Sequence, residues 1–197
     1  MTPTFHFPDI YHGDHAVSFH DMAAAGIPLV ILKATEGTAY TDPAFAARAA
    51  RVRSVPGLAL GAYAFLDARP GPPQAAHFLS AAHLQPGDLQ PVVDAEKLGL
   101  TKAETFAALT DLEGRGYRPI LYASLSFWRD VLGSPTRWAL WLAAYCATLP
   151  ALPDDVTLFA WQHSENSTCP GVVGPCDMSY AYGNLSDYLI GAVVQPS

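Results

Sequence analysis

The sequence has few basic residues and no long hydrophobic run. Only 11 of its 197 residues are Lys or Arg, against 18 Asp or Glu, so the formal net charge is -7. Nucleic acids and anionic membrane surfaces attract clustered positive charge, and the chain has no basic cluster. Apolar stretches are about ten residues or shorter, whereas a bilayer span needs roughly 20. Neither nucleic acid nor a membrane is therefore expected as a partner.

The first residues, MTPTFHFPDIYHGD, lack the basic and apolar regions of a signal peptide. Charged residues make up only 15% of the chain and hydrophobic residues 50%, which is enough to bury a substantial core. No repeat, charge run or linker-like stretch divides the sequence. We therefore expect a soluble protein with a single domain over residues 1–197.

Cysteine is scarce, with three in the chain. Cys169 and Cys176 end the Gly/Pro-rich stretch CPGVVGPC, which can fold back far enough to bring both Cα atoms within bridging distance. A disulfide and two free thiols both stay open, because the sequence does not reveal the redox compartment. Cys146 is expected to be unpaired.

Short apolar runs rich in Val, Ile, Leu and aromatics alternate with amphipathic, Ala-rich segments, which is typical of βα units. Strands are expected at residues 5–10, 28–34, 58–65, 90–96, 118–123, 139–145, 157–162 and 177–182. Helices are expected at 17–25, 43–53, 73–83, 102–115 and 125–132. Asp42 and Pro43 form an N-cap and N1 pair, and Thr101 to Glu104 reads as a capping box.

The helical signal fades beyond residue 133, where loops replace crossover helices. The pattern therefore predicts an α/β fold, a modified TIM-type β/α barrel with five βα units followed by about three helix-poor strands. A doubly wound open sheet is the alternative. Catalytic groups of such barrels lie at the carboxyl ends of the strands. The polar residues near the expected ends are Asp9, Glu36, Tyr63, Asp94, Glu96, Tyr122, Ser124, Tyr145, Trp161, Gln162 and Asp177.

Two carboxylates follow one apolar run in PVVDAE, residues 91–96. Side chains two apart on a strand share a face, so Asp94 and Glu96 are expected about 7 Å apart in one cavity. Like charges at that distance repel by roughly 2 kcal/mol at an effective dielectric near 20, which raises one pKa. One acid then keeps its proton near neutrality while the other is ionised, as glycosidic cleavage requires. We assign Glu96 as general acid and Asp94 as the anion.

Less specific interpretations exist for the same residues. A D-x-E at a strand end is often solvated, Asp177 can cap a helix, and Asp9 can lie in a solvated turn. The residues His6, His12, Asp14 and His15 suggest a metal-dependent hydrolase, although their spacing fits no compact zinc pattern. A third alternative is a barrel that binds cell-wall glycan without cutting it.

The order of motifs resembles the glycoside hydrolase family 25 lysozymes, muramidases of bacteria, phages and some fungi that cut peptidoglycan. The matching stretches are PDI at 8–10, AAGIPLVILKATEGTAYTDPAF at 24–45, GAYAF at 61–65, PVVDAE at 91–96, RPILYASLSFW at 118–128, LWLAAY at 140–145, WQ at 161–162 and CDMSYAYG at 176–183. The resemblance covers nearly the whole chain. It implies the barrel expected above and hydrolysis of the β-1,4 bond between N-acetylmuramic acid and N-acetylglucosamine.

The resemblance also implies residue roles. Glu96 matches the proton donor, and Asp94 matches a carboxylate that steadies the substrate's 2-acetamido group as that group, or water, attacks the anomeric carbon. Asp9 and Asp177 match two further cleft acids, and Tyr63 matches a tyrosine that contacts the reacting sugar. No metal or cofactor is implied. The partner is the peptidoglycan glycan strand, cut by a monomer outside the cell or in the periplasm after release.

Other mouth residues are expected to contact substrate, and the chain departs from the family at three positions. Glu36, Tyr122 and Tyr145 are expected to line the mouth, with a Lys33–Glu36 tether as the alternative for Glu36. Trp161 is a candidate sugar platform, with core packing as its alternative, while Trp128, Trp138 and Trp141 are read as core. Gly13 and Asp14 replace an aromatic and an amide, and Ala64 replaces a histidine. The acid at Asp14 is expected to raise the pKa of Glu96 further.

Overall fold

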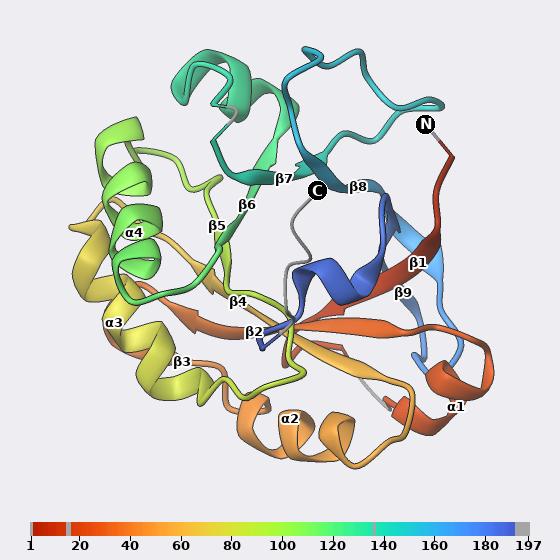
Figure 1. Ribbon diagram of the computed structural model, residues 1–197. Helices are drawn as coiled ribbons and strands as arrows, with labels where there is room; N and C mark the ends of the chain where they lie inside the picture. Colours follow the sequence, from red (N-terminus) through yellow and green to blue (C-terminus); the bar gives the residue numbers. More distant parts are fainter. Residues whose placement is uncertain (1, 15–16, 136, 192–197) are drawn as a thin grey trace.

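A computed structural model describes residues 2–14, 17–135 and 137–191 and shows a closed β-barrel (Figure 1). Its strands are β1 (Phe5–Ile10), β2 (Leu29–Glu36), β4 (Ala59–Phe65), β5 (Val92–Asp94), β6 (Ile120–Ser124), β7 (Ala139–Ala143), β8 (Leu158–Thr168) and β9 (Pro175–Ala181). The order is β1-β9-β8-β7-β6-β5-β4-β2, and β2 pairs again with β1. The short β3 (Tyr40–Thr41) extends β2 as a hairpin. The predicted barrel is confirmed, and the open sheet is excluded.

One strand runs against the others. β9 is antiparallel to both β1 and β8, whereas the remaining barrel pairs are parallel. Residues 169–174 join β8 to β9 as a tight loop, and antiparallel strands can be joined so closely while parallel ones cannot. The expected TIM-type strand at 177–182 is thus reversed. Its amino end, with Asp177, lies at the carboxyl end of its neighbours.

Helices cover the barrel beside its first strands (Figure 1). They are α1 (Phe19–Ala24), α2 (Phe45–Arg53), α3 (Gly71–Ala82) and α4 (Lys102–Gly114), followed after β6 by the π-helical η1 (Phe127–Val131). Loops alone connect β7, β8 and β9, as the fading helical signal predicted. Across the described residues, no helix has the length and apolar character needed to cross a bilayer.

Two predicted helix starts differ in detail. α2 begins at Phe45, and Asp42 caps the preceding turn by accepting from the Ala44 N–H at 2.8 Å. At α4 the Thr101 hydroxyl accepts from the Glu104 N–H, but the Glu104 carboxylate accepts from the Gly71 N–H at 2.8 Å instead of closing a capping box. Glu104 therefore ties α4 to the start of α3.

Side chains alternate between an inner and an outer core. The inner cluster fills the barrel with large apolar groups, namely Phe7, Leu29, Ile31, Val92, Ile120, Trp141 and Phe159. Gly61 leaves room for this packing, because a Cβ there would lie 2.7 Å from Cγ1 of Ile31. At the amino ends of the strands, the 3-10 turn η2 (Leu185–Tyr188) covers the inner cluster, with the Tyr188 ring 4.8 Å from that of Phe159. Among the described residues, η2 therefore covers the inner cluster at the amino ends of the strands.

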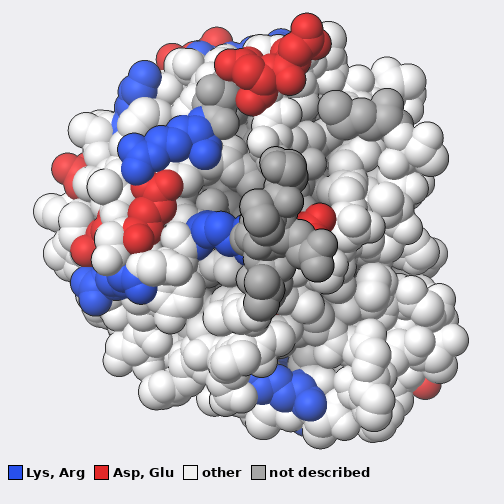
Figure 2. Space-filling view, in the orientation of Figure 1, with Lys and Arg blue, Asp and Glu red and all other residues white. Residues whose placement is uncertain are grey.

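On the face that carries η2, the described residues show charges of both signs (Figure 2). Lysine and arginine side chains lie among aspartate and glutamate side chains there, mainly on the half that α3 and α4 cover (Figure 2).

Cys169 and Cys176 are both buried near the β8–β9 loop and are free thiols in the structure, as is the exposed Cys146. Of the two states that the sequence left open, the structure shows the unbridged one.

Candidate active site

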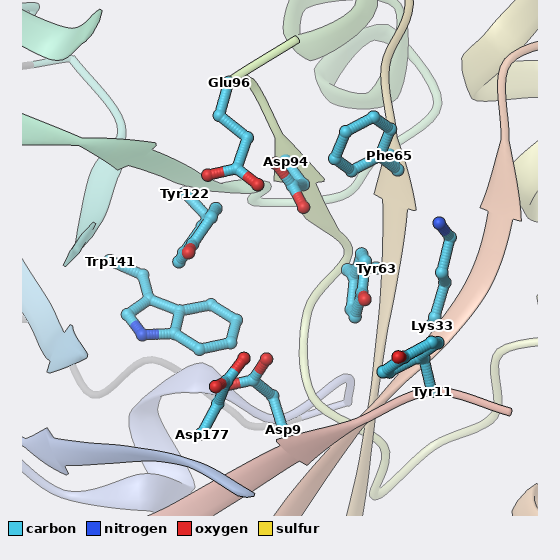
Figure 3. A pocket seen from close by; sticks show the side chains of 10 residues that line it. All are labelled: Asp9, Tyr11, Lys33, Tyr63, Phe65, Asp94, Glu96, Tyr122, Trp141 and Asp177. Atoms are coloured by element: carbon cyan, nitrogen blue, oxygen red, sulfur yellow. The ribbon is translucent and has the colours of Figure 1, made fainter. Parts of the chain in front are cut away.

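A cavity of about 250 Å³ opens where the strands end (Figure 3). It is lined by Asp9, Tyr11, Lys33, Tyr63, Phe65, Asp94, Glu96, Tyr122, Trp141 and Asp177. A second hollow of about 470 Å³ shares Asp9, Tyr11, Tyr63 and Asp177 with it and adds Asp14, Glu165 and Asn166 among others. We call the first hollow the acid pocket and the second the side pocket. Together they form one cleft.

Strand alternation explains why polar groups gather here. On several strands an inward-facing apolar residue of the inner core is followed, two residues later, by a polar one. Val92 precedes Asp94 in this way, and Ile120 precedes Tyr122. Because parallel strands end at the same rim, these polar side chains meet in the acid pocket.

Asp94 and Glu96 share the acid pocket, but not as members of one strand. β5 ends at Asp94, so the expected strand at 90–96 is shorter, and Glu96 lies in the exposed loop that follows. Ala95 is fully buried in the outer core and points away. Figure 3 shows both carboxyl groups entering the pocket from one wall. The expectation of one shared cavity therefore agrees with the geometry.

The surroundings of the pair raise the pKa of both carboxyl groups. Burial, and then the charge of Glu96, raises the pKa of Asp94 well above its usual range. Burial also raises the pKa of Glu96, and the Lys33 ammonium counteracts the rise at both groups. Asp94 is only 6% exposed and its Oδ1 has no hydrogen-bond partner, so its surroundings oppose ionisation more strongly than those of the exposed Glu96. The division into Glu96 as general acid and Asp94 as anion stays a prediction.

Asp9 and Asp177 face each other across neighbouring strands. They are direct partners in the β1–β9 ladder. Burial, and then the nearby charge of Asp177, raises the pKa of Asp9 well above its usual range. Burial, with Asp14 and Glu165 next, raises the pKa of Asp177 to about 6. The reversed β9 creates this pairing, and Asp177 caps no helix.

A buried glutamine holds Asp9 in place. The Gln162 amide donates to Oδ2 of Asp9 at 2.9 Å, and its carbonyl accepts from the hydroxyls of Tyr122 at 2.8 Å and Tyr145 at 3.0 Å. Tyr122 lines the acid pocket, as expected. Tyr145 is 53% exposed and reaches the site through Gln162, so the structure gives it a supporting position.

Glu36 organises cations and does not line the cleft. Its carboxylate accepts from Lys33 at 2.8 Å and from Lys97 at 3.4 Å, and the Lys33 bond lowers its pKa. Both ammonium groups lie over the Phe65 ring, at 4.7 and 5.3 Å from its centre. The expected substrate contact at Glu36 is therefore replaced by the tether that was its alternative, which fixes Lys33 at the pocket wall.

The two tryptophans exchange their expected positions. Trp161 packs in the outer core, is 6% exposed and donates to the Ala144 carbonyl at 2.7 Å, so it forms no sugar platform. Trp141, expected as core only, lines the acid pocket and donates to the Ser179 hydroxyl at 2.9 Å. Tyr11 and Phe65 also line the acid pocket, which the sequence did not predict. Their only signal was the position of each aromatic at a strand end.

The metal alternative finds no support among the residues described. Within them, no three His, Cys, Asp or Glu side chains are arranged to hold a metal ion. His12 instead has its Nδ1 atom 3.0 Å from Oδ2 of Asp42, and His15 falls outside the described residues.

The departures from the family pattern at Ala64 and Asp14 have limited effects. Ala64 packs in the outer core, away from the cleft, and Asp14 raises the pKa of Asp9 and Asp177, whereas no effect on Glu96 is resolved.

The chain was compared with known proteins. The sequence profile of Glycosyl hydrolases family 25 matches residues 8–172. The autolytic lysozyme of Clostridium acetobutylicum is 26% identical over 86% of this chain and 53% of its own length. The N,O-diacetylmuramidase of Chalaropsis sp is 28% identical over 94% of this chain and 93% of that protein. The chain thus spans about half the length of the clostridial relative.

Solved structures share the fold. The bacterial lysozyme of Streptomyces coelicolor superposes with a TM-score of 0.84 at 25% identity, covering 98% of both chains. A family 25 glycosyl hydrolase of Bacillus anthracis gives a TM-score of 0.82 at 20% identity, over 94% of this chain and 92% of that one. The chain has the barrel and an acid-lined mouth, and the family profile matches residues 8–172. The chain therefore belongs to family 25 of the glycosyl hydrolases.

Proposed function

We propose that this protein is a muramidase, which hydrolyses the β-1,4 bond between N-acetylmuramic acid and N-acetylglucosamine in peptidoglycan. One observation carries the proposal. Asp94 and Glu96 lie in the same open cleft, and burial raises the pKa of both. Carboxyl groups kept neutral in this way can donate protons at mildly acidic or neutral pH.

Glu96 is the proton donor in this proposal. It lies two residues beyond the end of β5 and is exposed, so the oxygen of an incoming glycosidic bond can reach its carboxyl group. The proton passes from Glu96 to the leaving sugar's oxygen as the bond to the anomeric carbon breaks. The Glu96 carboxylate then accepts a proton from the water molecule that completes hydrolysis.

Asp94 stabilises positive charge in the proposed transition state. The 2-acetamido oxygen of the substrate, or a water molecule, attacks the anomeric carbon as the leaving group departs. Positive charge developing beside a carboxyl group lowers its pKa. Asp94 is the carboxylate beside which that charge forms, and the charge counteracts the effect of burial on its pKa. Asp9, held by Gln162, and Asp177 bind sugar hydroxyls, and Tyr63 presents its hydroxyl to the reacting sugar.

Purified peptidoglycan tests this function and its alternatives. We expect the turbidity of a peptidoglycan suspension to fall in the presence of the protein, and to fall equally with a chelator added. A loss of activity with the chelator would support the metal-dependent alternative. Pelleting with cell walls without any loss of turbidity would support the binding barrel. Action on the wall outside the cytoplasm as a monomer remains part of the proposal.

The position of Lys33 predicts a change in pH profile. Its ammonium lowers the pKa of both Asp94 and Glu96, so a Lys33→Met variant should hold their protons to higher pH. Activity that needs protonated Glu96 falls as pH rises through its pKa. The alkaline limb of the kcat profile should therefore move up by about 0.5–1 pH unit. Lys97→Met serves as control, and an unchanged limb in Lys33→Met would refute this role.

A further inference from the structure

Tyr11 occupies a position between the two hollows of the cleft that the catalytic proposal leaves unexplained. It follows β1, and its side chain lines both the acid pocket and the side pocket. Figure 3 shows its ring among the side chains that line the acid pocket. The side chain nevertheless remains 47% exposed. A large aromatic group is thus presented to the cleft instead of being packed into either core.

The loop is built to hold this ring. The Tyr11 N–H donates to Oδ2 of Asp14 at 2.8 Å, and the Asp14 N–H donates back to the Tyr11 carbonyl at 3.0 Å. The Arg48 guanidinium donates to the carbonyls of both residues and so anchors the turn to α2. The His12 ring meets the Tyr11 ring edge-on at 5.2 Å.

Gly13 is required by the ring and not by the backbone. A Cβ at residue 13 would lie 2.5 Å from both Cζ and the hydroxyl oxygen of Tyr11, so the ring occupies the space of that side chain. Gly13 has no left-handed φ that would itself select glycine. The absent side chain at residue 13 therefore leaves the space that the ring of Tyr11 occupies.

From these contacts we infer that Tyr11 is the platform for a sugar that adjoins the cleaved bond. The pyranose ring of that sugar packs against the Tyr11 ring at the boundary of the acid pocket and the side pocket. The inference rests on the proposed function and extends it to a specific subsite. Glu96 and Asp94 line the acid pocket and not the side pocket, so the glycosidic bond is cut in the acid pocket. The adjoining sugar then extends over Tyr11. The surrounding carboxylates bind hydroxyl groups, and an aromatic ring supplies the apolar surface that one face of a pyranose needs.

The test is binding and turnover of a soluble tetrasaccharide of alternating N-acetylglucosamine and N-acetylmuramic acid. In a Glu96→Gln background, Tyr11→Ala should raise the dissociation constant about tenfold, whereas Tyr11→Phe should stay within about twofold because the ring face is kept. In the active enzyme, Tyr11→Ala should raise KM with a much smaller change in kcat. Gly13→Ala should weaken binding in the same direction by displacing the ring. Tyr180→Ala, an exposed tyrosine that lines neither pocket, should leave both constants unchanged.

Two results would overturn the inference. One is a dissociation constant for Tyr11→Ala within twofold of its parent while thermal unfolding shows a folded protein, which would assign the ring to loop packing only. The other is an equal loss in Tyr11→Phe and Tyr11→Ala, which would assign the effect to the hydroxyl. Failure of the proposed function looks different, since the unmodified protein would then release no sugar while the binding comparison could still be made.

Discussion

A Glu96→Gln variant should lose at least about 10³-fold in kcat on peptidoglycan while folding normally. Glutamine has nearly the same shape as glutamate but cannot donate an acidic proton, and general acid catalysis typically contributes 10²–10⁴-fold. Because Glu96 is exposed in a loop, the substitution disturbs little packing. The measurement is the rate of release of reducing ends by equal amounts of each protein, with circular dichroism as the check on folding.

A matched control separates charge from chemistry. Glu113 is also a glutamate, but it lies on α4 near the opposite end of the barrel, where it pairs with Arg137. Glu113→Gln should keep full activity. If Glu96→Gln kept its kcat within tenfold of the unmodified protein, another group would have to supply the proton.

The second large effect is expected for Asp94→Asn, which should lower kcat by about 10²-fold or more and stabilise the fold at pH 7. The activity falls because a neutral amide cannot take up the charge that the proposed transition state requires. The stability rises because the folded protein raises the pKa of Asp94, so ionisation of this buried group opposes folding.

The sign of the pH dependence follows from the same shift. Between the ordinary pKa of aspartate, about 4, and the raised pKa in the fold, the native state binds more protons than the unfolded chain, so stability falls as pH rises. Thermal melts should show Asp94→Asn above the unmodified protein at pH 7, by about 2–4 °C for each kcal/mol gained. The difference should disappear near pH 4. Asp111→Asn, on the surface of α4, should show no gain, and a gain in Asp94→Asn that persists at pH 4 would contradict this account.

Much of the site followed from strand alternation. Asp9, Asp94 and Tyr122 could be placed at the mouth because each lies near the carboxyl end of an apolar strand. The direction of β9 could not be read in this way, because alternation is the same in parallel and antiparallel strands. Asp177 was therefore expected at the rim without the partner, Asp9, that it meets there.

The tryptophans show where a regular pattern fails. Phe159 belongs to the inner core, and an unbroken alternation would turn Trp161 inward as well. The β7–β8 register instead shifts after the Leu140–Leu158 pair, and this bulge turns Trp161 to the outer core. A bulge inserts one residue without any marked change in composition, so the sequence alone does not show it. Gln162, one residue later, turns inward and binds Asp9.

Loop residues were harder still. The position of the Tyr11 ring and the space left by Gly13 depend on contacts with Asp14 and Arg48. Both of these residues lie outside the strands, so strand alternation does not predict the contacts. The same holds for Glu36 at the end of β2, whose carboxylate lies between Lys33 of its own strand and Lys97 of the loop after β5. Such contacts follow from the closed barrel, which brings successive loops to one rim.

The central claim is that this cleft cuts the glycan after N-acetylmuramic acid, and identification of the new reducing end tests it most directly. Purified peptidoglycan would be digested, reduced with borohydride and analysed by mass spectrometry of the released fragments. The account predicts that reduced N-acetylmuramic acid appears at the fragment ends with the unmodified protein and not with Glu96→Gln. Reduced N-acetylglucosamine ends, or fragments cut only within the peptide, would contradict it.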